Sequence, residues 1–432
     1  MKNRPAIPLN TTMTRIQRYQ ANPIHQIVRH ALSKTELNAV TTELKSHGQH
    51  QFLFNLDLPT MKVTNQKASG RCWIYSGLNV LRELIAKANH IEDFELSQNY
   101  IHFYDKYEKI NYYMEAMIKL VDEDSDDRTV AFLNATGIQD GGQWDMLVSL
   151  VKKYGVVAKS AMLDTFQSNN TRQTNQVINL KLHKFTADIR KLHQDGKDDL
   201  IRPYKDKTLD EFFDFLASCY GVPPTQFDFE YKDKESNEVK LVANLTPQDF
   251  YGKFITMNLD DYISVINAPT KDKPFNKAFT VAYLGNVIGG NDINYLNVPM
   301  ARLKELVIKQ LSDKELVWFG SDVAMMGDRD QALWDANIFD YENTFKMKLD
   351  MDKADMLDYR QSAMNHAMVI TGVHLIDGKP QRFKIQNSWG PVGPNGGYFV
   401  MSDAWFDQFV YQAVIHKKYL SEVEVNALKE KP

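Results

Sequence analysis

The stretch 65–75, NQKASGRCWIY, constrains the fold most strongly, because it places a cysteine at the start of an amphipathic helix. Gly70 breaks the preceding segment, so Cys72 is predicted to fall in the first helical turn. Unpaired N–H groups and the dipole at a helix start favour a thiolate over a thiol, and Arg71 adds a neighbouring positive charge. Apolar residues then follow at the spacing of one buried helix face: Ile74, Leu78, Leu81 and Ile85.

Cys72 is therefore a candidate nucleophile. Gln66 lies six residues upstream, and its side-chain N–H beside the backbone N–H of Cys72 predicts an oxyanion hole for an attacked carbonyl. The alternative is a buried structural thiol, as in most free cysteines. The glycine turn, the helix start and the adjacent cation weigh against that reading for Cys72. Cys219 lies among apolar residues without a glycine or a cation beside it, and we expect it to be structural.

Composition excludes several classes of protein. The 432 residues, 43% apolar and 25% charged, are typical of a globular protein large enough for two or three domains. A net charge of −4 without a basic block argues against nucleic-acid binding. No apolar run is long enough for a membrane span, and the N-terminus has no apolar signal region. Two cysteines fit a reducing compartment, so we expect a cytoplasmic protein.

A thiolate nucleophile needs a base, and the base needs an orienting partner. His366 stands at the start of a predicted strand, and Asn387 follows the next strand 21 residues later, a separation suited to a hairpin. The amide oxygen of Asn387 is expected to orient the imidazole, with Trp389 shielding that bond from water. A metal site built on His366 and His374 is rejected because no third ligand stands at a useful spacing. His374 is expected to be an ordinary histidine, and no cofactor is needed.

The two ends of the chain differ in pattern. Long helices with buried faces are predicted after residues 97 and 143, whereas β-rich runs with turn signals between them occupy 368–376, 382–386, 397–401 and 413–419. Between 160 and 345 the chain mixes charged helices with short strands. These patterns predict an α+β fold in which a helical half faces an antiparallel β half.

The paired glycines Gly141 and Gly142 precede one of those helices. Backbone without side chains is what a site needs if an extended substrate is to lie against it. A plain turn before a helix would show the same pattern. The residues alone leave both readings open.

These motifs resemble the active-site blocks of the papain superfamily, and most closely those of its bleomycin hydrolase/aminopeptidase C branch. The blocks are, in chain order, Gln66 with 70–73, 96–98, 140–142, 366–367 and 387–390, and the signatures of the branch are 141–146, Tyr251 and 318–320. Papain-type enzymes have their His and Asn about 130–150 residues after Cys. Here the distance from Cys72 to His366 is 294 residues, so about 150 residues are inserted.

The resemblance implies a papain-like fold with a large inserted segment. It divides the chain into an N-terminal segment packed on the core (1–60), a helical half with Cys72 (61–160), an inserted helical and oligomerisation region (161–345) and a β half with His366 and Asn387 (346–432). It also implies a homohexamer whose active sites face an internal channel.

The resemblance further implies a role for each site residue. Cys72 is the nucleophile, His366 the general acid and base, Asn387 orients His366, and Gln66 completes the oxyanion hole. Gly141 and Gly142 would offer backbone hydrogen bonds to a peptide substrate. No metal or organic cofactor takes part.

The implied activity is intracellular peptide-bond hydrolysis through a thioester, and the branch favours an aminopeptidase. In its aminopeptidases, a C-terminal arm lies in the cleft and recognises the substrate's free amino group. Residues 427–432 do not resemble that tail, so an endopeptidase or oligopeptidase with an open cleft is the alternative. The alternative from another class is a non-catalytic assembly or binding protein, and the complete set of nucleophile, base, orienting residue and oxyanion donor argues against it.

Overall fold

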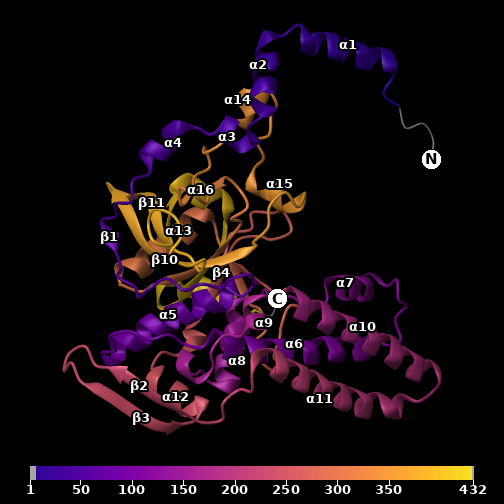
Figure 1. Ribbon diagram of the computed structural model, residues 1–432, viewed down its shortest axis with the longest axis vertical. Coiled ribbons are helices and arrows are strands. Elements are labelled where there is room, and N and C mark those ends of the chain that lie inside the picture. Colours follow the sequence, from indigo (N-terminus) through magenta and orange to yellow (C-terminus); the bar gives the residue numbers. More distant parts are fainter. Residues whose placement is uncertain (1–5, 431–432) are drawn as a thin grey trace.

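The computed structural model describes residues 6–430, which form a helical layer and a sheet-centred layer with a pair of helices extending away from both (Figure 1). The main helices of the helical layer are α5 (Cys72–Asn89), α6 (Gln98–Lys119), α7 (Arg128–Thr136), α8 (Trp144–Tyr154), α10 (Arg172–Gln194) and α11 (Ile201–Tyr220). The predicted helices after residues 97 and 143 are α6 and α8. α6 begins where the Ser97 hydroxyl accepts a hydrogen bond from the Tyr100 amide at 3.1 Å.

The β layer is one eleven-stranded sheet. Its strand order is β5-β6-β4-β13-β7-β10-β11-β12-β9-β8, and β1 pairs with Gly372 and Val373 of β10, beyond the part of β10 that pairs with β7. Most neighbours are antiparallel, as expected, but β4–β6 and β12–β9 are parallel. Long connections separate the strands of both parallel pairs, and a parallel return requires such a connection. The bounds are β1 Leu56–Asp57, β4 Tyr262–Ile266, β5 Lys277–Phe279, β6 Tyr295–Asn297, β7 Val317–Ser321, β8 Gly327–Asp328, β9 Leu333–Trp334, β10 His366–Ile376, β11 Lys379–Gln386, β12 Tyr398–Ser402 and β13 Val410–His416.

Both layers take residues from the segment 161–345. It supplies α10, α11 and the separate hairpin of β2 (Phe227–Lys232) and β3 (Val239–Leu245) to one side, and β4 to β9 to the sheet. β7 lies in the middle of that sheet, between β13 and β10. Residue 345 therefore coincides with no structural division, because sheet pairing joins strands that are remote in sequence.

The N-terminal segment has two parts. α1 (Leu9–Gln20) and α2 (Pro23–Leu32), here called the N-terminal arm, extend away from the β layer and contain no buried residue (Figure 1). From α3 (Leu37–Thr41) and α4 (Leu44–Gln49) onward the chain lies along the β layer, where the Glu43 amide donates to the Ile338 carbonyl at 2.9 Å. Only this second part has the packing on the core that was expected for 1–60.

One hydrophobic core joins the two layers, and the N-terminal end of α5 lies at their junction. The Ser76 hydroxyl donates to the Ala367 carbonyl at 2.8 Å, and the Trp318 indole N–H donates to the Trp73 carbonyl at 3.2 Å. Trp73 and Trp318 are each 1% exposed. Burying side chains of this size contributes about 3 kcal/mol each, so the start of α5 is held firmly against β7 and β10.

The remaining elements complete the two layers, and α13 and α16 among them pack against interior strands of the sheet. They are η1 (Lys159–Ala161), α9 (Phe166–Asn169), η2 (Asp198–Leu200), α12 (Pro247–Phe254), η3 (Leu259–Asp261), α13 (Met300–Ser312), α14 (Tyr341–Phe345), α15 (Lys353–Asp358), α16 (Asp403–Phe409), η4 (Lys417–Tyr419) and α17 (Glu422–Ala427). Between residues 6 and 430, no helix combines the length and the apolar character needed to cross a membrane.

Candidate active site

Cys72 is the first residue of α5 and lines a cavity of about 310 Å³ together with His366, Gly141 and Gly142. The side chain is 8% exposed. The Arg71 carbonyl already accepts from the amides of Ile74 and Tyr75, which closes the first turn and leaves the amides of Cys72 and Trp73 without helical partners. The thiol therefore stands at a helix start, as the sequence predicted.

Burial raises the pKa of the Cys72 thiol, while the backbone N–H groups of Ala367, Trp73 and Cys72 itself lower it. The expected stabilisation of a thiolate by the helix start is thus present, but desolvation outweighs it. The prediction that the positive charge of Arg71 would favour a thiolate at Cys72 was wrong. Its guanidinium is fully buried and donates to Asp164 at 3.0 Å and Asn169 at 3.1 Å, so its charge is neutralised away from the sulfur.

His366 is the first residue of β10, opposite Ser321 of β7, and its ring is held by Asn387. The imidazole Nε2 lies 2.9 Å from Asn387 Oδ1, which also accepts the Ser388 amide at 2.7 Å. Because Oδ1 is the acceptor in both bonds, Nε2 carries the hydrogen and Nδ1 is free to accept a proton. The hairpin of β10 and β11 therefore brings His366 and Asn387 together.

The surroundings of His366 favour its neutral form. Burial lowers the pKa of His366 to about 4, the hydrogen bond with Asn387 raises it, and the positive charge of Arg329 lowers it. The Trp389 ring stacks on the imidazole with centroids 5.0 Å apart. Trp389 therefore covers the imidazole beside the His366–Asn387 bond, as expected.

Gln66 is buried in the loop before α5 and joins that loop to the end of β11. Its Nε2 donates to the Ser69 carbonyl at 2.6 Å, and its Oε1 accepts from the Ser388 hydroxyl at 2.7 Å. The Gln66 amide also donates to the Ser388 carbonyl at 2.8 Å. These bonds fix the carboxamide and leave its second N–H available to an oxyanion.

The two glycines differ in their surroundings. A Cβ on Gly142 would lie 2.6 Å from the Trp73 ring, whereas a Cβ on Gly141 would meet nothing within 4 Å. Gly142 is thus required by packing, and Gly141 leaves open space in the cavity. The segment leads into α8, as a turn before a helix would, and contact of these glycines with a substrate stays a prediction.

Residues 7–432 match the Peptidase C1-like family. The chain belongs to this family. It is 45% identical over 416 residues to Aminopeptidase C of Listeria monocytogenes, covering 96% of this chain and 94% of the relative. It is 48% identical over 370 residues to Aminopeptidase C of Lactobacillus delbrueckii subsp. lactis, covering 85% and 82%.

Among solved structures, the peptidase is similar to PepW of Lactobacillus rhamnosis HN001, with a TM-score of 0.96 and 46% identity over 98% of this chain and 95% of that one. The predicted membership of the papain superfamily and its aminopeptidase C branch is confirmed. The predicted α+β papain-like fold is confirmed as well. The protein is a cysteine-type peptidase.

A buried charged cluster that was not predicted from the sequence lies beneath the peptidase site. It is made by Asp105, Lys106 and Lys109 of α6 with Asp140. Lys106 is fully buried, and its ammonium lies 2.6 Å from Asp140 Oδ1. Asp140 Oδ2 accepts the Gly70 amide at 3.0 Å, and the Asp140 carbonyl accepts the Trp73 indole N–H at 2.7 Å. Asp140 thereby braces both sides of Cys72. The available signal was the i, i+4 spacing of Asp105 and Lys109, which places the two side chains together on one face of α6.

The lining of this cavity includes the apolar side chains of Ile138, Met146, Leu284 and Met364. These side chains suit an uncharged portion of a substrate. In residues 6–430, no three His, Cys, Asp or Glu side chains converge where a metal ion would sit.

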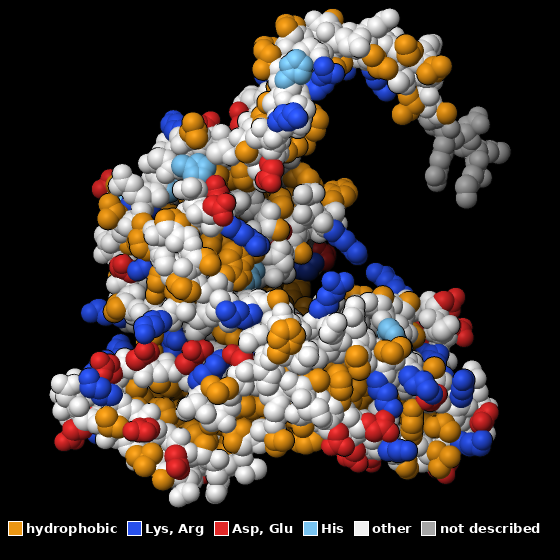
Figure 2. Space-filling model, viewed as in Figure 1, with side chains coloured by type: hydrophobic (Ala, Val, Ile, Leu, Met, Phe, Trp, Pro, Cys, Tyr) orange, Lys and Arg blue, Asp and Glu red, His pale blue; other side chains and the backbone are white. Residues whose placement is uncertain are grey.

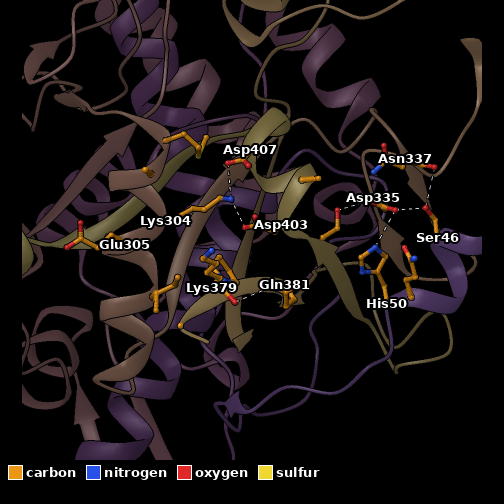
Figure 3. Close-up of a pocket in the computed structure, with 18 of the residues that line it drawn as sticks. Ser46, His50, Lys304, Glu305, Asp335, Asn337, Lys379, Gln381, Asp403 and Asp407 are labelled. Atoms are coloured by element: carbon orange, nitrogen blue, oxygen red, sulfur yellow. Dashed lines mark hydrogen bonds and ion pairs between the residues drawn. The ribbon is translucent and has the colours of Figure 1, made fainter. Parts of the chain in front are cut away.

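A larger cavity, about 1280 Å³, lies between α4, α13 and α16 on the β layer (Figure 3). Two pairs of its side chains contact each other: Lys304 with Asp403 at 2.5 Å, and Asp335 with His50 at 3.3 Å. The Ser46 hydroxyl donates to Asp335 at 2.5 Å, so it is bound to the carboxylate and not to the imidazole. This arrangement provides no activated nucleophile.

Proposed function

We propose that this chain is a cysteine aminopeptidase that releases N-terminal residues from peptides, with Cys72, His366, Asn387 and Gln66 as its catalytic residues. The observation that carries the proposal is the convergence of Cys72 and His366 on one cavity, with the imidazole held by Asn387 at 2.9 Å. The Aminopeptidase C relatives support it because they align with almost the whole chain. Nothing in these relatives favours the endopeptidase or the non-catalytic alternative.

The proposed reaction begins when Nδ1 of His366 takes the proton of the Cys72 thiol and the sulfur attacks the carbonyl carbon of the scissile bond. The carbonyl oxygen becomes an oxyanion, which accepts hydrogen bonds from the Cys72 amide and the free N–H of Gln66. The imidazolium then protonates the departing amine, and a thioester remains on Cys72. Water, deprotonated by His366, attacks the thioester and restores the thiol.

The electrostatics of the resting site support this sequence of proton transfers. Burial opposes a thiolate at Cys72 and an imidazolium at His366, so each charged form is disfavoured on its own. Proton transfer creates both charges together as an adjacent pair. The bond from Asn387 stabilises the imidazolium half of that pair.

Two fluorogenic peptides that differ only in a free or blocked N-terminus test the proposed function. We expect hydrolysis of the free-amine peptide only, and no hydrolysis of either peptide by Cys72→Ala. Cys219→Ala is the matched control: it removes the other free thiol and should keep full activity. Cleavage of both peptides would replace the aminopeptidase with an endopeptidase, and cleavage of neither would contradict a peptidase altogether.

We also propose that the protein forms a homo-oligomer, a hexamer by its family resemblance, through the N-terminal arm. Apolar side chains on the arm are exposed, among them Leu9 at 76%, Ile24 at 59% and Ile27 at 63%, and hydrophobic atoms follow its surface in Figure 2. A helix pair without a buried residue has little stability alone, so the arm needs a partner surface. A second copy of the chain is the partner we propose.

Light scattering tests this assembly. The unmodified protein should have the mass of six 49.8 kDa chains, and the double variant Ile24→Ser/Ile27→Ser should dissociate. Val423→Ser is the control, since it removes a similarly exposed apolar side chain, 67% exposed, outside both the arm and the segment 161–345. A monomer in the unmodified protein would contradict the proposal.

The two free cysteines support the further proposal of a reducing, cytoplasmic location.

A further inference from the structure

Arg329 presents a positive charge beside the candidate active site. Its guanidinium carbon lies 4.4 Å from the centroid of the Trp389 ring, and its side chain is exposed. No acidic group of residues 6–430 lies within ion-pair distance of this guanidinium. The neighbouring Asp328 is occupied elsewhere, since it pairs with His47 at 3.1 Å and accepts the amides of Asp330 and Gln331.

Arg329 is connected to the catalytic imidazole through Trp389. The Trp389 ring stacks on His366 at 5.0 Å and carries Arg329 at 4.4 Å. The indole also packs edge-on against Phe399, with centroids 5.6 Å apart, which fixes its plane. The position of the guanidinium is therefore set by a rigid aromatic platform, and such stacking is a geometry that arginine prefers.

The guanidinium lies on the side of the site where the departing part of a peptide must lie. The cavity that holds Gly141 and Gly142 reaches Cys72 and His366 but is not lined by Trp389 or Arg329. In the proposed reaction, the acyl part of the substrate lies along the glycines, and His366 delivers its proton to the departing amine. Trp389 and then Arg329 stack outward from the His366 imidazole, outside that cavity. We therefore expect them to lie next to the departing part of the peptide.

We propose that Arg329 binds a carboxylate on the departing part of the peptide and gives the enzyme a preference for acidic leaving peptides. This inference rests on the proposed peptidase function and names a specificity residue for it. A carboxylate is the chemistry that fits, because the planar guanidinium donates two parallel N–H bonds to it. The carboxylate can be the side chain of Asp or Glu directly after the scissile bond, or the free C-terminus of a short peptide.

The charge of Arg329 gives this contact a second effect. Arg329 lowers the pKa of His366 and so opposes the imidazolium that must protonate the leaving amine. A bound carboxylate offsets that positive charge. An acidic leaving peptide would thus be bound by Arg329 and would also ease protonation of His366.

Three peptides test the proposal. All have the same free N-terminal residue; the first has Glu after the scissile bond with an amidated C-terminus, the second has Gln with the same amide, and the third has Gln with a free C-terminal carboxylate. We expect kcat/KM of the unmodified enzyme to be about three- to fivefold higher for at least one carboxylate peptide than for the neutral one, the range of a partly exposed ion pair. The preference should decrease as salt is added. Which peptide is preferred identifies the source of the carboxylate.

The variants are Arg329→Gln, which should remove the preference while still hydrolysing the neutral peptide, and Arg329→Lys, which should keep part of it. Lys253→Gln is the control, because it removes an exposed cation from α12 in the helical layer and should leave the preference unchanged. Equal rates for all three peptides in the unmodified enzyme would overturn the inference, as would a preference that survives in Arg329→Gln. In both cases, hydrolysis of the neutral peptide would leave the peptidase function standing. If the unmodified enzyme hydrolysed none of the three peptides, both the peptidase function and the role of Arg329 would be overturned.

Discussion

The ammonium of Lys109 donates a 2.6 Å hydrogen bond to the carbonyl of Gly141, one of the two glycines proposed to face the substrate. It also donates to the Gln139 carbonyl at 3.2 Å and pairs with Asp105 at 2.7 Å. Asp105 is fully buried and accepts a further bond from Asn286 at 3.1 Å. One buried cation of α6 thus fixes the backbone that leads into the glycine turn.

Lys109→Met should raise KM more than it lowers kcat. The Gly141 carbonyl loses its hydrogen bond from Lys109, whereas the hydrogen bond between His366 and Asn387 is retained. A hydrogen bond from a charged donor is worth about 1.5–3 kcal/mol, so we expect a loss of about tenfold or more in kcat/KM. The same change leaves Asp105 as an unpaired buried carboxylate and should lower the free energy of unfolding by about 3 kcal/mol.

The double variant Lys109→Met/Asp105→Asn separates these two effects. Removing the unpaired charge should recover much of the lost stability, but Gly141 would remain without its donor. KM should therefore stay high when the midpoint of urea unfolding returns toward that of the unmodified protein. Recovery of both quantities would show that Lys109 serves stability alone.

Asn387→Ala should lower kcat by about 100-fold, because general acid–base catalysis by His366 depends on the orientation of its ring. Without Oδ1, Nε2 loses its acceptor and the imidazolium loses a stabilising bond. Steady-state kinetics with the free-amine peptide provide the measurement. Asn387→Asp, which keeps an acceptor oxygen at this position, should retain more activity than the alanine variant, and equal losses would argue against an orienting role.

Gly142→Ala and Gly141→Ala should have opposite signatures. A methyl group on Gly142 would lie 2.6 Å from the Trp73 ring, and overpacking of this kind costs about 1–3 kcal/mol. A methyl group on Gly141 meets open space, so stability should be unchanged while KM rises because the methyl group occupies the substrate's place. Thermal unfolding and kinetics on the two variants distinguish these outcomes. An unchanged KM in Gly141→Ala would remove Gly141 from the proposed binding site.

The candidate site residues could be proposed from the sequence because their chemistry depends on residue type and local position. Cys72 at a helix start, His366 at a strand start and Asn387 after the next strand all have local signals. The partner of Arg71 had no such signal, since Asp164 follows 93 residues later and becomes a neighbour only in the folded chain. For that reason, the prediction that the charge of Arg71 acts on Cys72 was wrong.

The fold shows the same limit. β10 to β13 span five to eleven residues each and were predicted from their β-rich runs. β5 and β6 have three residues each, too few for a clear alternating pattern, and they join the sheet only because β6 pairs with β4 and β5 pairs with β6. The charged cluster under Cys72 was missed because Lys106 and Lys109 are residue types that usually lie in solvent.

His366 should make the stability of the protein depend on pH. Burial lowers its folded-state pKa to about 4, below the ordinary value of about 6.5 in an unfolded chain. Between these two values the unfolded chain binds a proton that the folded chain does not, so folding stability is full above about pH 6.5 and falls as the pH decreases toward about 4. The loss between pH 7 and pH 4.5 should be about 2 kcal/mol from this group.

Urea unfolding of the unmodified protein and of His366→Gln at both pH values, at one protein concentration, provides the measurement. Other titrating groups contribute to both proteins alike, so the difference between the two losses isolates His366. Equal losses would mean that His366 is already protonated in the folded protein, as a resting ion pair with Cys72 would require.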